Sequence, residues 1–547
     1  MDLGEKQLSS SLEDNIINIR TIMNNSSDLT LKRAKAAGHD ICIIFCEGMA
    51  STETMADLIF RPINELNAAI GKAHGEIRKE TNGAAQGEPS KETHRETQGE
   101  AKGETQGEPP MPLETLTKTL EEGIILAGEQ KISKTYNEVA QDIMSGFVEI
   151  LTEGVDHALS VGVQGYASRS VEEPSTHNNV RSSRDGFVEV VRTNVSLVRR
   201  RMKNPDLVFK MMTTGDMSNT DICMCYIKGV ADKNLVRAVE KRLKELPLNT
   251  ILECGYIQPF LENPGSQIFS EVGVTERPDT FTSKLHEGKI GVLVDGTPFA
   301  LYVPKLFMEN FNVMDDYTGR PLYTAVIRVI RYMAIIIATV TSGFYVALAN
   351  FNPELIPEAL LLNLATSIQD TPYPLLAECL IIHIFYEIMR EAGLRIPAHI
   401  GHAVSIIGGL VIGDIVVSAG LVGAPMVLVV AVSAITSFVV PDLYDSIAVL
   451  RFGYILAGGL WGLFGITVLS AIITVKLCSQ ESYGVPHTAP LSPFSPKAMR
   501  DFIIRRGWRK LSQEDYRVQD LEGVNVGEET DTAKEVNMGE SVGAGEG

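Results

Sequence analysis

The stretch that decides the fold is LLAECLIIHIFYEIMREAGLRIP, residues 375–397, together with the apolar sequence that follows it as far as Pro441. Two long apolar segments, 400–421 and 425–441, come directly after it and are separated by only three residues. Each has close to the ~20 residues that a helix needs to cross ~30 Å of hydrocarbon. A soluble core rarely needs two such segments in succession. The pattern predicts a membrane domain over residues 326–480.

Four segments of this domain are predicted to cross the bilayer: 329–349, 400–421, 425–441 and 453–475. Basic residues precede the first span and a basic cluster follows the last, and such clusters favour the cytoplasmic side. We therefore expect both termini to be cytoplasmic, which requires an even number of crossings. Residues 356–391 are too short or too charged for an independent span, so we expect a re-entrant or cavity-lining segment there.

The composition bears on several function classes. The 547 residues carry a net charge of −19, which argues against a nucleic-acid-binding protein, since such proteins present a basic face. The seven cysteines are scattered without a metal-ligand spacing, and no catalytic triad, phosphate-binding loop or paired-acid motif stands out. We expect no enzyme, no cofactor and no metal.

The half of the chain before the membrane domain has a different pattern, with short apolar runs that alternate with helical spacing. It predicts two related α/β subdomains, residues 27–163 and 205–305. The sequence DIC at 40–42, with Gly48 after it, matches DIC at 221–223, with Gly229 after it. A second match pairs residues 122–126 with 287–292. The predicted fold class is thus a soluble α+β or α/β N-terminal half followed by an all-α polytopic membrane domain.

The remaining segments connect or extend these parts. Residues 73–110 repeat short acidic words with almost no large apolar side chain, so we expect a disordered insertion. The other expected parts are a polar leader at 1–26, an Arg-rich connector at 164–204, a linker at 306–325 and a basic, then acidic, cytoplasmic tail at 481–547.

The Arg-rich connector is a candidate contact surface, because arginine is well suited to fixed paired contacts. It is equally consistent with a solvated face or with anionic headgroups at a membrane surface. The candidate inter-subunit contact residues are Arg181, Arg184, Arg199, Arg200 and Arg201.

Ionisable residues at membrane depth are the candidates for function, since charges there are costly and usually face a bundle interior, a partner or a water-filled path. The alternative is pairing within the helix, Glu387 with Arg390 and Glu391 with Arg395. The candidate ion-path or gating residues are Glu378, Glu387, Arg390, Glu391, Arg395 and Asp414.

From about residue 28 to 511, interrupted by the insertion, the chain resembles the A subunits of the GerA family of spore germination (germinant) receptors. Two departures concern Ser182-Ser183, where the family usually has Gly-Pro, and Asp414, where it usually has an uncharged polar residue. The words that carry the resemblance are RSVEEP (169–174), VRSSRDGF (180–187), TN and RRR (193–201), TERPD (275–279), VDGTP (294–298), FYVAL (344–348), PELIP (353–357), REAGLRIP (390–397) and GVP (484–486).

The resemblance implies a sensor in the spore inner membrane. It implies partners, a transporter-like B subunit and a lipoprotein C subunit, and a homo-oligomeric ring with a central ion path that responds to small nutrients. The membrane lipid is a further expected partner. Two alternatives stay open: a secondary transporter that uses the intramembrane acids as a relay, and a scaffold that holds the complex together without conducting.

Overall fold

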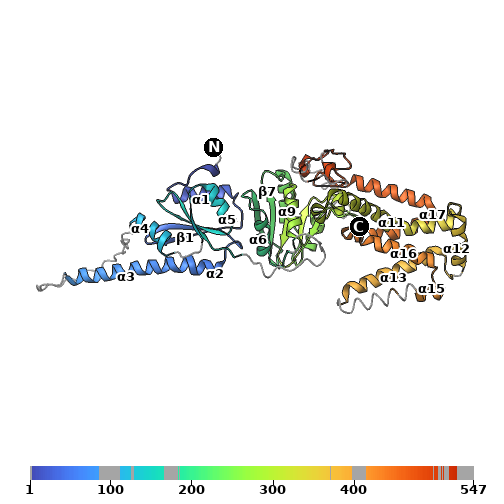
Figure 1. Ribbon diagram of the computed structural model, residues 1–547, viewed down its shortest axis with the longest axis horizontal. Coiled ribbons are helices and arrows are strands. Elements are labelled where there is room, and N and C mark those ends of the chain that lie inside the picture. The colour runs from blue at the N-terminus through green and yellow to red at the C-terminus, as the bar shows by residue number, and fades with distance from the viewer. Residues whose placement is uncertain are drawn as a thin grey trace, which may run out of the picture. The chain divides into compact units, whose positions relative to one another are not determined.

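The computed structural model divides the chain into two compact units (Figure 1). The α/β unit comprises Met1–Asn178, Ser183–Leu261 and Val274–Tyr302, and the helical unit comprises the remainder. The residues that the structure describes are 3–84, 111–124, 129–165, 183, 185–265, 267–369, 371–396, 409, 414–496, 498–502, 507, 509 and 517–525. Most of the predicted insertion and of the predicted span 400–421 lies outside these residues.

The first sheet of the α/β unit is antiparallel in every pairing and has the order β1-β2-β4-β5-β3. Helices cover both faces, so the strand β2 alternates between two cores. Ile41 and Ile43 pack in one core with α3, and Cys42 and Ile44 pack in the other with α1 and α5. Burial on both faces explains why β2 reads as a continuous apolar run. The strands are β1 (Leu29–Ala36), β2 (His39–Cys46), β3 (Gln130–Ser133), β4 (Phe147–Thr152) and β5 (Ala158–Gly162).

The helices of this part include one that runs further than the sequence suggested. Residues 61–72 carry apolar side chains at helical spacing, and Ile63 is buried against the sheet. The helix begun there, α3, continues to residue 84, inside the predicted insertion 73–110. The helices are α1 (Leu12–Ile22), α2 (Thr52–Met55), α3 (Arg61–Ala84), α4 (Leu113–Lys118) and α5 (Tyr136–Met144), with π-helical segments at Ala56–Phe60 and Thr119–Ile124.

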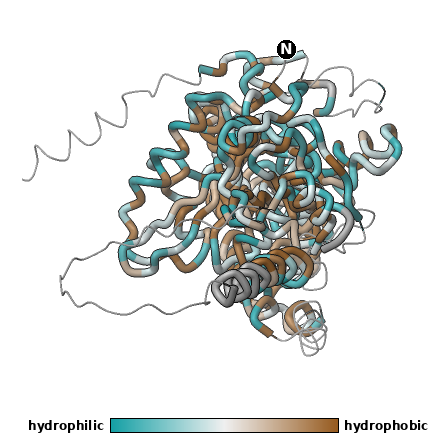
Figure 2. Tube along the Cα trace, turned by 90° about the vertical axis from the view of Figure 1, so that its left-hand side faces the viewer, coloured by the Kyte–Doolittle hydropathy of each residue, from teal (hydrophilic) through white to brown (hydrophobic). Residues whose placement is uncertain are grey.

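The second sheet repeats the first strand for strand, with the order β6-β7-β9-β10-β8. Its long hairpin keeps the same register, because Leu207 faces Ile227 as Leu29 faces Cys46. Teal and brown alternate along the helices of the trace in Figure 2, as expected for elements with one buried face. The elements are α6 (Val191–Arg201), β6 (Leu207–Thr214), β7 (Thr220–Ile227), α7 (Lys233–Lys244), α8 (Gln258–Leu261), β8 (Gly273–Thr275), α9 (Pro278–His286), β9 (Ile290–Val294) and β10 (Ala300–Val303).

The prediction of two related α/β subdomains is therefore confirmed, and one of its two sequence matches is correct. Gly48 and Gly229 occupy the same place after β2 and β7, with φ of 77° and 79°. The second match is wrong, because residues 119–124 form a π-helical segment and the counterpart of β9 is β4. The glycine equivalent to Gly288 is Gly146, which also has φ near 88°. The match rested on the dipeptide Glu-Gly, at 122–123 and at 287–288, and the first of these lies within the π-helical segment.

One buried position at which the two sheets differ in polarity is Glu149 of β4. The shared register makes Glu149 of β4 equivalent to Gly291 of β9. A side chain at position 291 would collide with Phe281. Glu149 is fully buried, and the Ser160 hydroxyl donates to its Oε2 over 2.8 Å. Burial raises the pKa of Glu149 to about 8, against the lowering effect of the Ser160 bond; the nearby Asp142 raises it further. The carboxyl is thus protonated at neutral pH.

This carboxyl makes local stability depend on pH. Unfolding lets Glu149 ionise with an ordinary pKa, so the free energy of unfolding falls as pH rises from about 4.5 to about 8, by about 1.4 kcal/mol per unit. Glu149→Gln removes this dependence. Hydrogen exchange of residues 147–162 is measured in the full-length parent and variant at each pH. The exchange rate of the parent divided by that of the variant should grow up to about pH 8 and then stay constant. A ratio independent of pH would contradict the assignment.

The helical unit is built around α11, which packs against both α16 and α17 in two apolar clusters. Among the described residues, α11 and the segment Pro441–Ser479 are the two helices that are long and apolar enough to cross a membrane. The fold class is confirmed, with the α/β unit followed in sequence by helices. They are α10 (Asp315–Thr318), α11 (Pro321–Phe351), α12 (Glu358–Gln369), α13 (Leu375–Arg395), α15 (Val416–Ser418), α16 (Ala424–Ser437) and α17 (Tyr444–Ser479); short strands β11 (Glu481–Ser482) and β12 (Val485–Pro486) follow.

The helix α17 folds back on itself at Gly462, which has φ 61° and ψ −148°. The hydroxyls of Tyr454 and Ser470 lie 3.0 Å apart, whereas sixteen residues of unbroken helix would separate them by about 24 Å. Residues 453–475, expected as one span, are therefore parts of two arms that pack side by side. Each arm, of about 18 residues, is about 27 Å long and close to the thickness of a bilayer core.

The first arm of α17 runs beside α11 in the same direction. A Cβ on Gly343 of α11 would lie 2.2 Å from the Tyr454 carbonyl oxygen, and one on Gly458 would lie 2.3 Å from the Gly343 carbonyl oxygen. Only glycine permits two backbones to approach this closely. The last residue of α11, Phe351, then lies against the turn at Gly462.

The turn at Gly462 should tolerate no other residue. Its backbone angles are essentially restricted to glycine, and an added Cβ would lie 2.9 Å from Cγ of Phe351. We expect Gly462→Ala to lower the free energy of unfolding by about 1–3 kcal/mol. The matched control is Gly453→Ala, where a Cβ meets Leu469 at an ordinary 3.6 Å. Thermal unfolding of the protein in detergent would measure both; equal stabilities of the two variants would contradict the hairpin turn.

Candidate functional site

A polar cluster lies between α13 and the first arm of α17 in the helical unit. The Tyr444 hydroxyl donates to both carboxylate oxygens of Glu387, at 3.1 and 2.9 Å. Arg451 reaches the same carboxylate with Nη1 at 3.3 Å. The guanidinium of Arg390 lies over the Tyr444 ring, 3.2 Å from its centroid. These four side chains, the polar cluster, connect the two helices through an ion pair, hydrogen bonds and a cation–π contact.

Two members of this cluster, Tyr444 and Arg451, were not predicted from the sequence, and only Arg451 carries a signal there. It stands in the apolar stretch SIAVLRFGYIL, just before the predicted last span, and was counted with neither the span nor the acids. A single arginine inside so apolar a stretch is the signal that points to it. In the structure Arg451 is fully buried and donates through Nε to the carbonyl of Ala338 on α11. Its Nη2 has no hydrogen-bond partner among the described residues.

Glu378 lies two and a half turns earlier on α13 and has a different role. It is buried, and its Oε1 accepts the backbone N–H of Gly423 over 2.7 Å, at the N-terminus of α16. A carboxylate there satisfies a free N–H group and complements the positive end of the helix dipole. Between the two acids, His383 is also buried and its Nε2 lies 3.1 Å from the Ser342 hydroxyl of α11. His383 and Glu387, about one turn apart, thus share one side of α13, whereas Glu378 lies on the opposite side and contacts α16.

The other predicted residues of the membrane domain lie on the outside of the described helices. Arg395 donates to Glu391 over 2.6 Å, and both side chains are mostly exposed. This pair is the intrahelical alternative that the sequence left open, whereas Glu387 pairs with Arg451 of another helix. Asp414 is exposed and does not join the polar cluster. The structure therefore brings Glu387 and Arg390 together, and keeps Glu391, Arg395 and Asp414 apart from them.

The Arg-rich connector is described only in part. Arg181 and Arg184 lie outside the described residues. Arg200 and Arg201 of α6 both pair with Asp185 at 2.8 Å and stay partly exposed. They remain available, in part, for a contact with another chain.

Arg199 is instead an interior residue that joins the two subdomains of the α/β unit. It is fully buried and donates to both oxygens of Asp28, at 2.9 and 3.0 Å, and to the carbonyl of Leu207. Burial alone would lower the pKa of its guanidinium, but the Asp28 carboxylate outweighs this and the net shift is upward. All these partners belong to its own chain.

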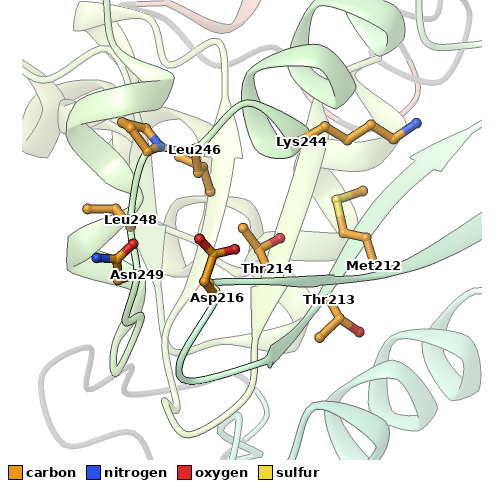
Figure 3. Close-up of a pocket in the computed structure, with 10 residues that line it drawn as sticks. Met212, Thr213, Thr214, Asp216, Lys244, Leu246, Leu248 and Asn249 are labelled. Atoms are coloured by element: carbon orange, nitrogen blue, oxygen red, sulfur yellow. The ribbon is translucent and has the colours of Figure 1, made fainter.

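A surface pocket of about 330 Å³ lies in the second subdomain, where β6 turns into β7 (Figure 3). Thr214 ends β6, Asp216 comes from the turn, Lys244 from the end of α7, and Leu248 and Asn249 from the segment after it. Lys244 is engaged with Glu240 of the same helix at 2.5 Å. Asp216 and Lys244 are the charged residues that line the pocket, and none of its lining side chains has a buried polar atom without a hydrogen-bond partner. In the described parts of the chain, no three His, Cys, Asp or Glu side chains converge as they would around a metal ion.

Comparison with known proteins decides what kind of protein contains this bundle. The family model described as "Bacillus/Clostridium GerA spore germination protein" matches residues 17–516. The chain belongs to the GerA family of spore germination proteins. The resemblance predicted from the sequence words is thus confirmed, and it extends through both units.

Individual members of the GerA family support the same assignment. Spore germination protein KA of Bacillus subtilis is 34% identical over 92% of this chain and 85% of its own length. The uncharacterized membrane protein YfkQ of Bacillus subtilis is 32% identical over 94% of this chain and 92% of its own. Spore germination protein B1 of Bacillus subtilis is 34% identical over 68% of this chain and 78% of its own. Their names describe germination or membrane proteins and no enzymatic activity.

One solved structure is also similar to the GerA-family chain. It is the crystal structure of the N-terminal domain of the A subunit of the Bacillus megaterium spore germinant receptor GerK3. It is 25% identical, with a TM-score of 0.38, and the alignment covers 55% of this chain and 98% of that domain.

The polar cluster predicts an asymmetric pair of substitution effects. Glu387→Gln leaves the fully buried charge of Arg451 without a carboxylate, which should lower the free energy of unfolding by about 3 kcal/mol. Arg451→Met leaves Glu387 with Tyr444 and partial solvent access, so the loss should be smaller. The double variant should lose less than the sum.

Thermal unfolding of the full-length protein in detergent would give these values. The matched control is Glu391→Gln, one turn further along α13, where loss of the exposed pair with Arg395 should change stability by less than about 0.5 kcal/mol. Additive effects of the Glu387 and Arg451 substitutions would show that the pair is not coupled.

Proposed function

We propose that this chain is the A subunit of a nutrient germinant receptor, which converts the binding of a small nutrient into ion release during spore germination. The observation that carries the proposal is the match to the GerA family over residues 17–516, with relatives named as spore germination proteins. The chain would work with a transporter-like B subunit and a lipoprotein C subunit, in the lipid of the spore inner membrane.

The mechanism we propose is an oligomeric, ligand-gated ion channel. Nutrient binding, on the B subunit, would shift an equilibrium between closed and open states of the A-subunit ring. The closed state is the arrangement in which Glu387 is paired with Arg451 and Tyr444. Releasing that pairing would free the Glu387 carboxylate to attract cations; Glu378, on the opposite side of α13, and Glu391, at the mouth, would contribute to the same path.

The energies are of compatible size. Moving a two-state equilibrium from 1:99 to 99:1 takes about 5.5 kcal/mol. Breaking a buried ion pair by loss of one partner costs about 3–5 kcal/mol, and less for a pair with one half-buried member such as Glu387. One such contact per subunit, summed over a ring, is therefore enough to hold a channel closed and is still within reach of a ligand.

The membrane topology we propose places both termini in the cytoplasm. Ala338 of α11 contacts Arg451, and Phe351, later in α11, contacts Gly462. Because the residue numbers rise together, α11 and the first arm of α17 run parallel. The second arm returns, and Gln480 after it bonds Phe269 and Glu271, while His487 bonds Lys305 before α11. The chain thus leaves the bundle on the side where it entered, as an even number of crossings requires.

Two other functions fit parts of the structure. A non-conducting scaffold is favoured by the fact that the charges of the polar cluster are paired with one another. A secondary transporter would use Glu378 and His383 as a relay, but the internal repeat found lies in the α/β unit, whereas transporters repeat their membrane spans. Cation conductance of the purified protein in liposomes separates the channel from the scaffold.

The proposed function is tested by deleting the gene in its own host. Spores without it should lose the refractility change and the cation release for a subset of single nutrients, while triggers that bypass receptors still work. A deletion strain complemented with the Glu387→Gln variant should release cations at an altered rate or selectivity. Complementation with the Glu391→Gln variant should change cation release less. Normal responses to every nutrient in the deletion strain would contradict a necessary role in nutrient sensing.

A further inference from the structure

The last part of the helical unit makes contacts that the proposed channel does not explain. We define the C-terminal clasp as the described residues that follow α17, namely 480–496, 498–502 and 517–525. It bonds three separate segments of the same unit: residues 262–273, residues 303–317 and the first turns of α11. In sequence, the first of these segments precedes β8 and the second follows β10, so both are stretches through which the chain connects the second sheet to the helices.

The first contact holds the stretch before β8. Gln480 is buried, and its side-chain amide donates to the Phe269 carbonyl at 2.9 Å and to the Glu271 carboxylate at 3.0 Å. Asn263 donates to the carbonyl of Glu481 at 2.5 Å. Glu271 is fully buried, so its interaction with Gln480 takes place away from water.

The second contact holds the stretch after β10. Nδ1 of the buried His487 ring lies 3.0 Å from the carbonyl oxygen of Lys305. The backbone N–H of Phe307 donates to the His487 carbonyl at 2.9 Å. Leu306, between them, packs in an apolar cluster with Val485, Ala489, Val518 and Leu521. Backbone bonds together with an apolar cluster fix the path of this stretch.

The third contact holds the base of α11. Arg328 is fully buried and donates to Asp316 at 3.0 Å and to Asp501 of the clasp at 3.1 Å. The Tyr317 hydroxyl donates to the other oxygen of Asp501 at 2.5 Å. The Tyr332 ring stacks on Phe502, with centroids 5.7 Å apart. Asp501 is therefore shared between the α10 segment and α11.

We propose that the C-terminal clasp is a coupling device: it fixes residues 303–317 to the base of α11, so that a displacement of this stretch moves α11 as one body. A loose linker would absorb such a displacement in its own backbone. With Lys305, Tyr317 and Arg328 all tied to the same clasp, the displacement reaches α11, and through the Ala338 carbonyl it reaches Arg451 of the polar cluster. The inference that this coupling serves gating rests on the proposed function.

The test uses Asp501→Asn, which keeps the size of the side chain and removes the charge that Arg328 and Tyr317 share. Tyr317→Phe is a second, milder variant, and Asp501→Glu should restore the coupling. Asp520→Asn, at an exposed aspartate of the same clasp, is the matched control. Hydrogen exchange of the full-length protein in detergent should become about tenfold faster over residues 305–332 in Asp501→Asn, with no change over 424–437 and none in the control.

The same variants in spores test the role of the coupling. Asp501→Asn spores, with the protein at its parental level, should respond to nutrient more slowly, and Asp520→Asn spores should respond like the parent. Unchanged exchange in Asp501→Asn would overturn the clasp itself, and faster exchange with a parental nutrient response would overturn its coupling role. A deletion strain that germinates normally would instead overturn the proposed function and leave the exchange result valid.

Discussion

The contact on which the helical unit depends most is the pairing of Arg451 with Glu387. A fully buried guanidinium among apolar helices is tolerated only with a nearby carboxylate and hydrogen-bond acceptors. Glu387 supplies the charge and Ala338 supplies a carbonyl, while the Tyr444 hydroxyl bonds the same carboxylate and Arg390 lies over the Tyr444 ring. The pair thereby fixes α13 relative to α11 and α17. A charged contact between helices that otherwise meet largely through apolar side chains is an evident place at which the bundle could change state.

The second constraint is the glycine pattern of α17. Gly343 and Gly458 let α11 and the first arm touch backbone to backbone, and Gly462 reverses the chain. Since the second arm returns to the base, the clasp that follows it can reach the stretches before β8 and after β10. The hairpin is therefore what allows residues near the C-terminus to hold the segment that leads into α11.

Much of this architecture could be predicted from the sequence, and the exceptions have physical causes. The repeated sequence DIC correctly marked β2 and β7, because a strand that is buried on both faces is a continuous apolar run, and here a turn with a glycine follows it. The Gly462 reversal could not be read, because a glycine inside an apolar helix predicts close packing as readily as a break. The match of residues 122–126 with 287–292 was wrong because a Glu-Gly dipeptide beside apolar residues occurs in a π-helical segment as well as in the turn before a strand.

For the site, the acids of α13 could be singled out from the sequence, since a charge inside an apolar stretch is costly in a bilayer. Their partners could not, because Arg451 and Tyr444 are more than fifty residues away and only the fold brings them to Glu387. Arg199 shows the converse: its place in a run of three arginines predicted an exposed contact, while the bonds to Asp28 place it in the interior. A charged residue in a sequence indicates that a partner is needed, but it does not indicate whether that partner lies in the interior of the same chain or on another molecule.

The central claim, that separation of α13 from the first arm of α17 opens an ion path, is tested most directly by joining the two helices. Glu387→Cys and Tyr444→Cys, in a background where the exposed Cys478 is serine, would be linked by a short reducible bis-thiosulfonate and followed by nutrient-driven cation release. The account predicts that release from the double variant stops when the link forms and returns to its untreated rate on reduction, whereas each single-cysteine variant, treated alike, keeps the rate it had before treatment. Undiminished release from fully linked protein would contradict it.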